Sequence, residues 1–148
     1  MPVEPPQEFF QFRIQTGPDN VVRIAMARVV FSGLDIRSAS QLSGLLAFDG
    51  HRVRRLHYLV PVPEFLQADI VFVGGTPRQY LPLLRRLRGL NRSLPVIVVA
   101  PSPETAEWLD ALEAGATDYC APPFDMRQVR SLLTPVGKMA MSAAAGMH

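Results

Sequence analysis

Short apolar runs alternate with amphipathic segments through the middle of the chain. The runs at 28–31, 70–73 and 96–99 read RVVF, IVFV and VIVV, and each is followed closely by glycine or proline. Runs that are almost continuously apolar and β-branched indicate strands buried on both faces. We therefore predict a parallel sheet whose strands are joined by helices.

Helical periodicity fills the intervals between these strands. Segment 35–48 places Ile36, Leu42, Leu45 and Leu46 near one helical face, with Asp35 as N-cap and a stop at Asp49–Gly50. Further helices are predicted at 77–90, 102–115 and 124–133, and the second of these has Ser102 as N-cap and Gly115 as stop. An outer strand is predicted at 51–59 and a short strand at 117–121. Alternating strands and helices of this kind form a three-layer α/β/α sandwich with a five-stranded sheet.

Sites in this architecture lie beyond the carboxyl ends of the strands. Here those ends are Ser32–Gly33, Gly74–Gly75, Ala100–Pro101 and 121–123. Any chemistry of the chain is therefore expected at these four places.

The stretch from Pro95 to Leu133 carries a family resemblance. LPVIVVA, a helix ending in ALEAGATDY, and the loop PPFD before a last helix resemble, in order and spacing, the receiver domain of bacterial two-component response regulators. The resemblance extends to residues 28–134 and implies a flavodoxin-like sheet with strand order 2-1-3-4-5. The segment 59–67 is short and carries two prolines, so we expect a shortened second helix.

Two flanking segments lie outside this receiver-like domain. Residues 1–27 form an N-terminal extension in which FFQFRIQ, GPDN and VVRIAMA predict either a hairpin arm or an extended segment laid over the core. Residues 135–148 are expected to be a C-terminal tail or a linker.

The resemblance implies a phosphoryl site, but the residues of that site are replaced. Receivers accept a phosphoryl group on an aspartate after the third strand. Acidic magnesium ligands follow the first strand, a hydroxyl residue follows the fourth and a lysine follows the fifth. The transfer needs all of these groups together, because it depends on positioning and on neutralising charge. This chain has Ser32 and Gly33 for the acidic pair, Gly74 for the acceptor, Ala100 for the hydroxyl residue and Pro122 for the lysine. We predict a degenerate receiver, with no enzymatic activity, metal or cofactor, that works without phosphorylation. The bond between Pro122 and Pro123 is a candidate cis peptide.

A protein contact is then the leading functional hypothesis. The fourth helix, fifth strand and fifth helix form an association face in the family, and here they carry Trp108, Ala111, Tyr119 and Arg127. Trp and Tyr are favoured anchors of interfaces, although both also occur as ordinary core residues. The expected partner is another protein or a second copy of the chain.

Two alternatives remain open. Loss of the charged residues could open a pocket for a small molecule or nucleotide between Gly33, Gly74 and Ala100. A DNA-associated regulator could use the arginines of the third helix, namely Arg78, Arg85, Arg86, Arg88 and Arg92. The net charge of only +2 and the lack of a recognition motif disfavour nucleic acid.

Composition bears on disulfides, metal sites and cellular location. The single cysteine, Cys120, excludes an internal disulfide and is expected to be a buried strand residue. His51, His57 and His148 lack the spacing of a metal site. No apolar run has the length of a membrane helix and the N-terminus does not resemble a signal peptide, so we expect a cytoplasmic protein. The resemblance to response regulators implies that it is bacterial.

Overall fold

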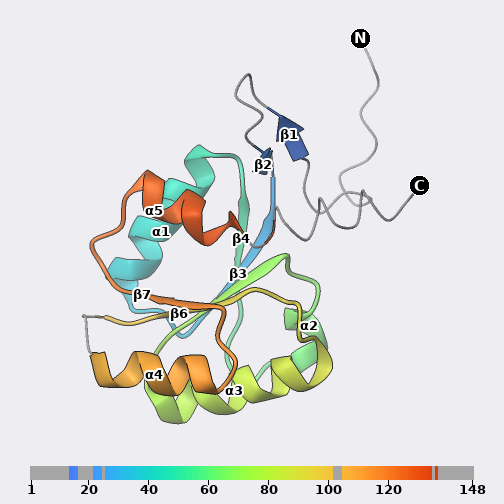
Figure 1. Ribbon diagram of the computed structural model, residues 1–148, viewed down its shortest axis with the longest axis vertical. Coiled ribbons are helices and arrows are strands. Elements are labelled where there is room, and N and C mark those ends of the chain that lie inside the picture. Colours follow the sequence, from blue (N-terminus) through green and yellow to red (C-terminus); the bar gives the residue numbers. More distant parts are fainter. Residues whose placement is uncertain (1–13, 17–21, 25, 102–104, 135, 137–148) are drawn as a thin grey trace.

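The computed structural model describes residues 14–16, 22–24, 26–101, 105–134 and 136. Its centre is a five-stranded parallel sheet with the order β4-β3-β5-β6-β7 (Figure 1). These strands are β3 (Arg28–Ser32), β4 (Arg52–Arg55), β5 (Ile70–Val73), β6 (Val96–Val99) and β7 (Asp118–Cys120). Counted along the sheet strands alone, this order is 2-1-3-4-5, which confirms the predicted flavodoxin-like receiver fold.

Helices cover both faces of the sheet, as Figure 1 shows. On one face lie α1 (Ile36–Phe48) and α5 (Met126–Leu132), and on the other α2 (Val62–Phe65), α3 (Pro77–Leu90) and α4 (Thr105–Glu113). Strand β5 serves both cores, since Ile70 and Phe72 pack with α1 and α5 while Val71 and Val73 pack with α3. This double burial explains why β5 has no polar residue.

The ends of α1 follow the predicted signals. The Asp35 side chain accepts a hydrogen bond from the Ser38 N–H at 3.1 Å, and Gly50 adopts a φ of +84° after the last turn. Leu42 and Leu46 are fully buried, but Ile36 is 83% exposed. The prediction that Ile36 belongs to the buried face was wrong, because at 3.6 residues per turn Ile36 lies about 120° around the helix from Leu42.

The second helix is reduced to a single short turn. Helix α2 spans only Val62–Phe65 and begins after Pro61, and this confirms the shortening predicted from the prolines. Helix α4 is described from Thr105, so its predicted cap at Ser102 lies outside the described residues. Within the described part of the chain, no helix is both long and apolar enough to cross a bilayer.

Two short strands precede the sheet. Strand β1 (Ile14–Thr16) pairs antiparallel with β2 (Val22–Ile24), with Ile14 opposite Ile24. Of the two alternatives for the N-terminal extension, this pairing favours the hairpin arm. The limits 1–27, 28–134 and 135–148 stay predictions.

Candidate functional site at the carboxyl edge of the sheet

Strand β3 ends at the first of the predicted positions. Ser32 is buried and lies opposite Val73 of β5, and within the described residues its hydroxyl has no hydrogen-bond partner. Gly33 follows with a φ of +79°, a conformation that residues with a side chain rarely adopt. The chain turns sharply here towards α1.

The backbones of Gly33 and Gly74 meet at the point where receivers hold their acceptor. The Gly74 N–H donates to the Ser32 carbonyl at 2.8 Å. A Cβ added to Gly33 would lie 2.6 Å from the Gly74 oxygen, and one added to Gly74 would lie 3.1 Å from the Val99 oxygen and 3.2 Å from the Gly33 oxygen. A side chain at Gly33 would therefore collide with the Gly74 backbone, and one at Gly74 would fit only if the neighbouring backbone shifted by a few tenths of an ångström. The alternative of a pocket for a small molecule or nucleotide between Gly33, Gly74 and Ala100 stays a prediction.

Ala100 and Pro122 complete the set without supplying a polar group. Ala100 is buried, and its N–H donates to the Cys120 carbonyl at 2.8 Å, so it extends the β6–β7 pairing. The Pro122–Pro123 peptide bond is cis, as predicted for this loop. Neither residue carries a hydroxyl group or a cation for a phosphoryl oxygen.

The two nearby aspartates are engaged elsewhere. Asp35 caps α1. Burial raises the pKa of its carboxyl group, but the hydrogen bonds from Ser38 together with those from the backbone of Asp35 and Arg37 lower this pKa overall. Asp69 lies at the opposite edge of the sheet, where its carboxylate accepts from the Arg28 N–H at 2.7 Å. Burial raises the pKa of Asp69 to about 6, against the lowering effects of Arg28. Neither carboxylate can replace the missing acceptor.

Cys120, His51 and His57 do not form a metal site with one another in the described part of the chain. Cys120 is buried in β7, as predicted, and burial together with Asp118 raises its pKa to about 12, so that it is a thiol at neutral pH. His51 is buried and His57 is exposed. The described residues contain no cluster of three histidine, cysteine or acidic side chains suited to a metal ion.

The predicted association face needs one correction. Trp108 is 38% exposed and Arg127 of α5 is exposed, whereas Tyr119 is half-buried against the α3 side of the core. Ala111 is fully buried in that core, so it cannot contribute to a surface. Helix α4 packs against α3 and β7, and Ala111 points into this contact.

Sequence reasoning missed two neighbours of Trp108. Leu109 is 51% exposed and Leu112 is 38% exposed, on the same helix. Leu112 lies four residues after Trp108 and three after Leu109, and this spacing was the available signal, since residues three or four apart are neighbours on a helix surface. We call Trp108, Leu109 and Leu112 the α4 patch.

We call the arginines that were considered for DNA binding the basic strip, namely Arg78, Arg85, Arg86, Arg88 and Arg92. One of them, Arg88, has a structural role. The Arg88 guanidinium donates to the Gly115 carbonyl, to the Asn91 carbonyl at 3.1 Å and to the Thr117 hydroxyl at 3.0 Å. Gly115 has a φ of +109°, and a Cβ there would lie 2.6 Å from Arg88 Cγ. The glycine of the GATDY motif therefore makes room for the arginine that ties α3 to the α4–β7 turn.

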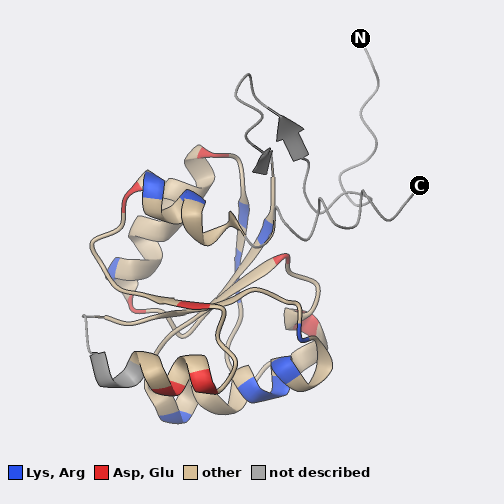
Figure 2. Ribbon diagram, viewed as in Figure 1, with Lys and Arg blue, Asp and Glu red and all other residues tan. Residues whose placement is uncertain are grey.

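The remaining arginines of the strip are exposed, but they have acidic neighbours. Figure 2 shows basic residues along α3 beside acidic residues on α4. Opposite charges on adjacent helices weaken the field that a polyanion would meet. DNA binding through the strip stays a prediction, with Arg88 removed from it.

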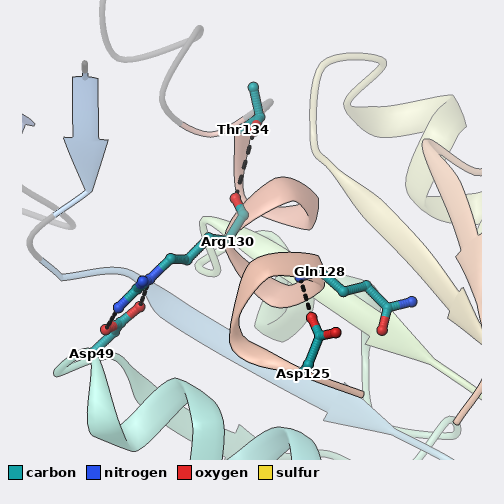
Figure 3. Close-up of polar contacts among 5 residues, drawn as sticks. All are labelled: Asp49, Asp125, Gln128, Arg130 and Thr134. Atoms are coloured by element: carbon teal, nitrogen blue, oxygen red, sulfur yellow. Dashed lines mark hydrogen bonds and ion pairs between the residues drawn. The ribbon is translucent and has the colours of Figure 1, made fainter. Parts of the chain in front are cut away.

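Helix α5 is fixed by polar contacts at both ends, drawn in Figure 3. Asp125 accepts from the Gln128 N–H at 2.8 Å and caps the helix. Arg130 forms a two-pronged pair with Asp49 at the end of α1, with Nε–Oδ2 and Nη2–Oδ1 both 2.9 Å. The association face is therefore carried by a helix that is anchored to the rest of the domain.

Fold and site together define a receiver-type domain whose phosphoryl-site positions are grouped at one edge but carry other residues. Solved structures agree with this class. A CheY-like receiver domain protein from Methanospirillum hungatei matches with a TM-score of 0.61 and 16% identity, over 79% of this chain and 98% of that one. An orphan response regulator of H. pylori, HP1043, matches with a TM-score of 0.58 and 22% identity, over 74% and 95%.

Particular curated relatives are response regulators. The chain is 26% identical over 92 residues to the phosphate regulon transcriptional regulatory protein PhoB of Klebsiella pneumoniae, a match covering 60% of this chain and 40% of that protein. It is 30% identical over 89 residues to the response regulator MprA of Mycobacterium tuberculosis, covering 57% and 39%. The chain thus spans about two fifths of these relatives' length. No protein-family profile matches it.

Proposed function

We propose that this receiver-type domain acts in signalling or assembly through protein–protein contact and does so without aspartyl phosphorylation. The observation that carries the proposal is the backbone contact between Gly33 and Gly74. It adds to the missing aspartate, because a side chain at Gly74 would also have to crowd the Val99 and Gly33 carbonyl oxygens. In this proposal the domain is a non-enzymatic binding module.

The α4 patch is the surface that we assign to the partner. Its three apolar side chains are exposed together on a helix that lies beside β7 and α3. Clustered aromatic and aliphatic side chains are the usual anchors of an interface, and exposed Arg127 supplies a charge at the rim. A second copy of the chain is the simplest partner for such a patch.

Sedimentation velocity over a range of protein concentrations tests this assignment. The native chain is expected to show concentration-dependent dimers. Trp108→Ala is expected to weaken dimerisation at least about tenfold, since an interface tryptophan commonly contributes about 2 kcal/mol or more. Phe48→Ala is the matched control, because Phe48 is a 79% exposed aromatic residue on the opposite face of the sheet.

A native chain that stays monomeric at all concentrations would contradict self-association. Equal weakening by both substitutions would contradict the α4 patch as the contact.

A further inference from the structure

The first peptide groups of β3 are held by two side chains from neighbouring loops. The Ala27 N–H donates to His51 Nδ1 at 2.9 Å, and the Arg28 N–H donates to Asp69 Oδ2 at 2.7 Å. His51 immediately precedes β4 and Asp69 immediately precedes β5. Because β3 lies between these two strands, the start of β3 is hydrogen-bonded by a side chain on each side.

The carbonyl groups of the same residues are bonded as well. The Ala27 oxygen accepts from the Arg52 N–H at 3.0 Å, and the Arg28 oxygen accepts from the Asp69 N–H at 2.9 Å. Strand pairing itself begins only at Arg28 with β4 and at Val29 with β5. A fully buried residue such as Ala27 must still satisfy its N–H, and here an imidazole does so.

This contact requires one protonation state of His51. An imidazole nitrogen accepts a hydrogen bond only when it carries no proton, so His51 must be neutral with its proton on Nε2. Burial lowers the pKa of His51, and the charge of Asp49 opposes this. Asp49 is itself paired with Arg130 of α5, so its charge is partly offset.

Asp69 has a different requirement. Its carboxyl group retains an acceptor oxygen when protonated, so the bond from the Arg28 N–H survives acidification in weaker form. The charged group that faces Asp69 is Arg28. Of the two side chains, only His51 loses its acceptor on protonation.

We propose that His51 and Asp69 form an acid-sensitive clamp on the point where the N-terminal extension enters the sheet. The clamp is closed at neutral pH, and protonation of His51 places two N–H groups against each other and opens it at Ala27. The segment that precedes this point carries β1 and β2, so acid loosens the attachment of that arm. This inference is independent of the proposed function, because it concerns the opposite edge of the sheet.

Amide hydrogen exchange of the full chain, measured by NMR between pH 7.5 and 5.0, tests the clamp. The protection factor of the Ala27 amide, corrected for intrinsic exchange, is expected to fall at least about tenfold on acidification, which is the loss of roughly one hydrogen bond. His51→Asn keeps an acceptor near the Nδ1 position but cannot be protonated, so its Ala27 protection is expected to stay constant. His57→Asn is the matched control on an exposed histidine, and it should retain the native pH profile.

Parallel pH profiles in the native chain and in His51→Asn would overturn the proposal. The nitrogen chemical shifts of His51 in the native chain give a second test that needs no variant. They should show an unprotonated Nδ1 at pH 7.5, and a proton on Nδ1 at that pH would equally overturn it.

Discussion

Gly33 and Gly74 each lack a side chain at a place where two strand ends come into contact. At Gly33 the φ of +79° and the 2.6 Å distance from an added Cβ to the Gly74 carbonyl oxygen both oppose any larger residue. We expect Gly33→Ala to lower the free energy of unfolding by about 2 kcal/mol or more, through backbone strain and contact with Gly74. Urea denaturation measures this difference.

Gly44→Ala is the matched control for that substitution. Gly44 lies in α1, and a Cβ there would meet nothing within 4 Å. The control should be neutral or stabilising by up to about 1 kcal/mol, because alanine is the better helix former. Similar losses for both variants would show that the strand-end contact is not what fixes Gly33.

The raised pKa of Asp69 predicts how the free energy of unfolding changes with pH. Its pKa is raised from 3.8 to about 6 in the folded chain, so the folded state binds the proton more tightly than the unfolded state. Its contribution to stability therefore decreases as pH rises from about 4 to about 6, and the loss persists above that range. Asp69→Asn cannot lose a proton, so its stability relative to the native chain should improve with rising pH, by about 1–2 kcal/mol after solvent screening.

Urea unfolding of the native chain and of Asp69→Asn at pH 4.5 and 7.5 measures this change. The side-chain oxygen of the substituted asparagine can still accept the 2.7 Å hydrogen bond from the Arg28 N–H, and the variant has no proton to lose, so the change of the stability difference with pH reports the titration of Asp69. A stability difference that is the same at both pH values would refute the raised pKa.

At the scale of elements, the apolar pattern predicted the strands well. Continuous runs such as 70–73 and 96–99 became strands buried on both faces, and 77–90 became α3 with the predicted bounds. Helical period was less informative about which residues are covered. The prediction for 35–48 grouped Ile36 with the buried leucines, although at 3.6 residues per turn Ile36 lies about 120° around the helix from Leu42. The family resemblance placed Ala111 on the association face, and its burial follows from the packing of α4 against α3 and β7, which a single sequence does not contain.

The contact that joins α3 to the α4–β7 turn was equally invisible in the sequence. Arg88 looks like its exposed neighbours in the run RRLR, and only the fold brings it under Gly115. We expect Arg88→Met to lower the free energy of unfolding by about 2–3 kcal/mol, because it leaves carbonyl groups without their donors. Thermal and urea unfolding measure the loss.

Arg85→Met serves as the control for Arg88→Met, since Arg85 is exposed on the same helix. Its effect should stay within about 0.5 kcal/mol. Comparable effects of the two substitutions would mean that the hydrogen bonds of Arg88 add nothing to the stability of the fold.

At the scale of the whole molecule, the sequence predicted where the candidate site lies but not how closely its backbone segments approach one another. The rule that sites lie beyond the carboxyl ends of parallel strands placed Ser32, Gly33, Gly74, Ala100 and Pro122 at one edge, and they do lie there. Whether their replacement would open a pocket or close one depends on the approach of two backbones. The structure brings the backbones of Gly33 and Gly74 into close contact. Our proposal is that this receiver-type domain keeps its framework and works without phosphoryl chemistry.

Phosphorylation of Gly74→Asp tests this central claim most directly. The native chain and the variant are incubated with acetyl phosphate and magnesium, with the CheY-like receiver of Methanospirillum hungatei as a reference protein, and intact mass is measured. Because backbone oxygens lie 3.1 and 3.2 Å from a Cβ at this position, and because no acidic pair or lysine accompanies it, neither chain is expected to gain a phosphoryl group. A stoichiometric phosphoryl adduct on the native chain, or on an otherwise folded Gly74→Asp variant, would contradict the proposal that this domain works without phosphorylation.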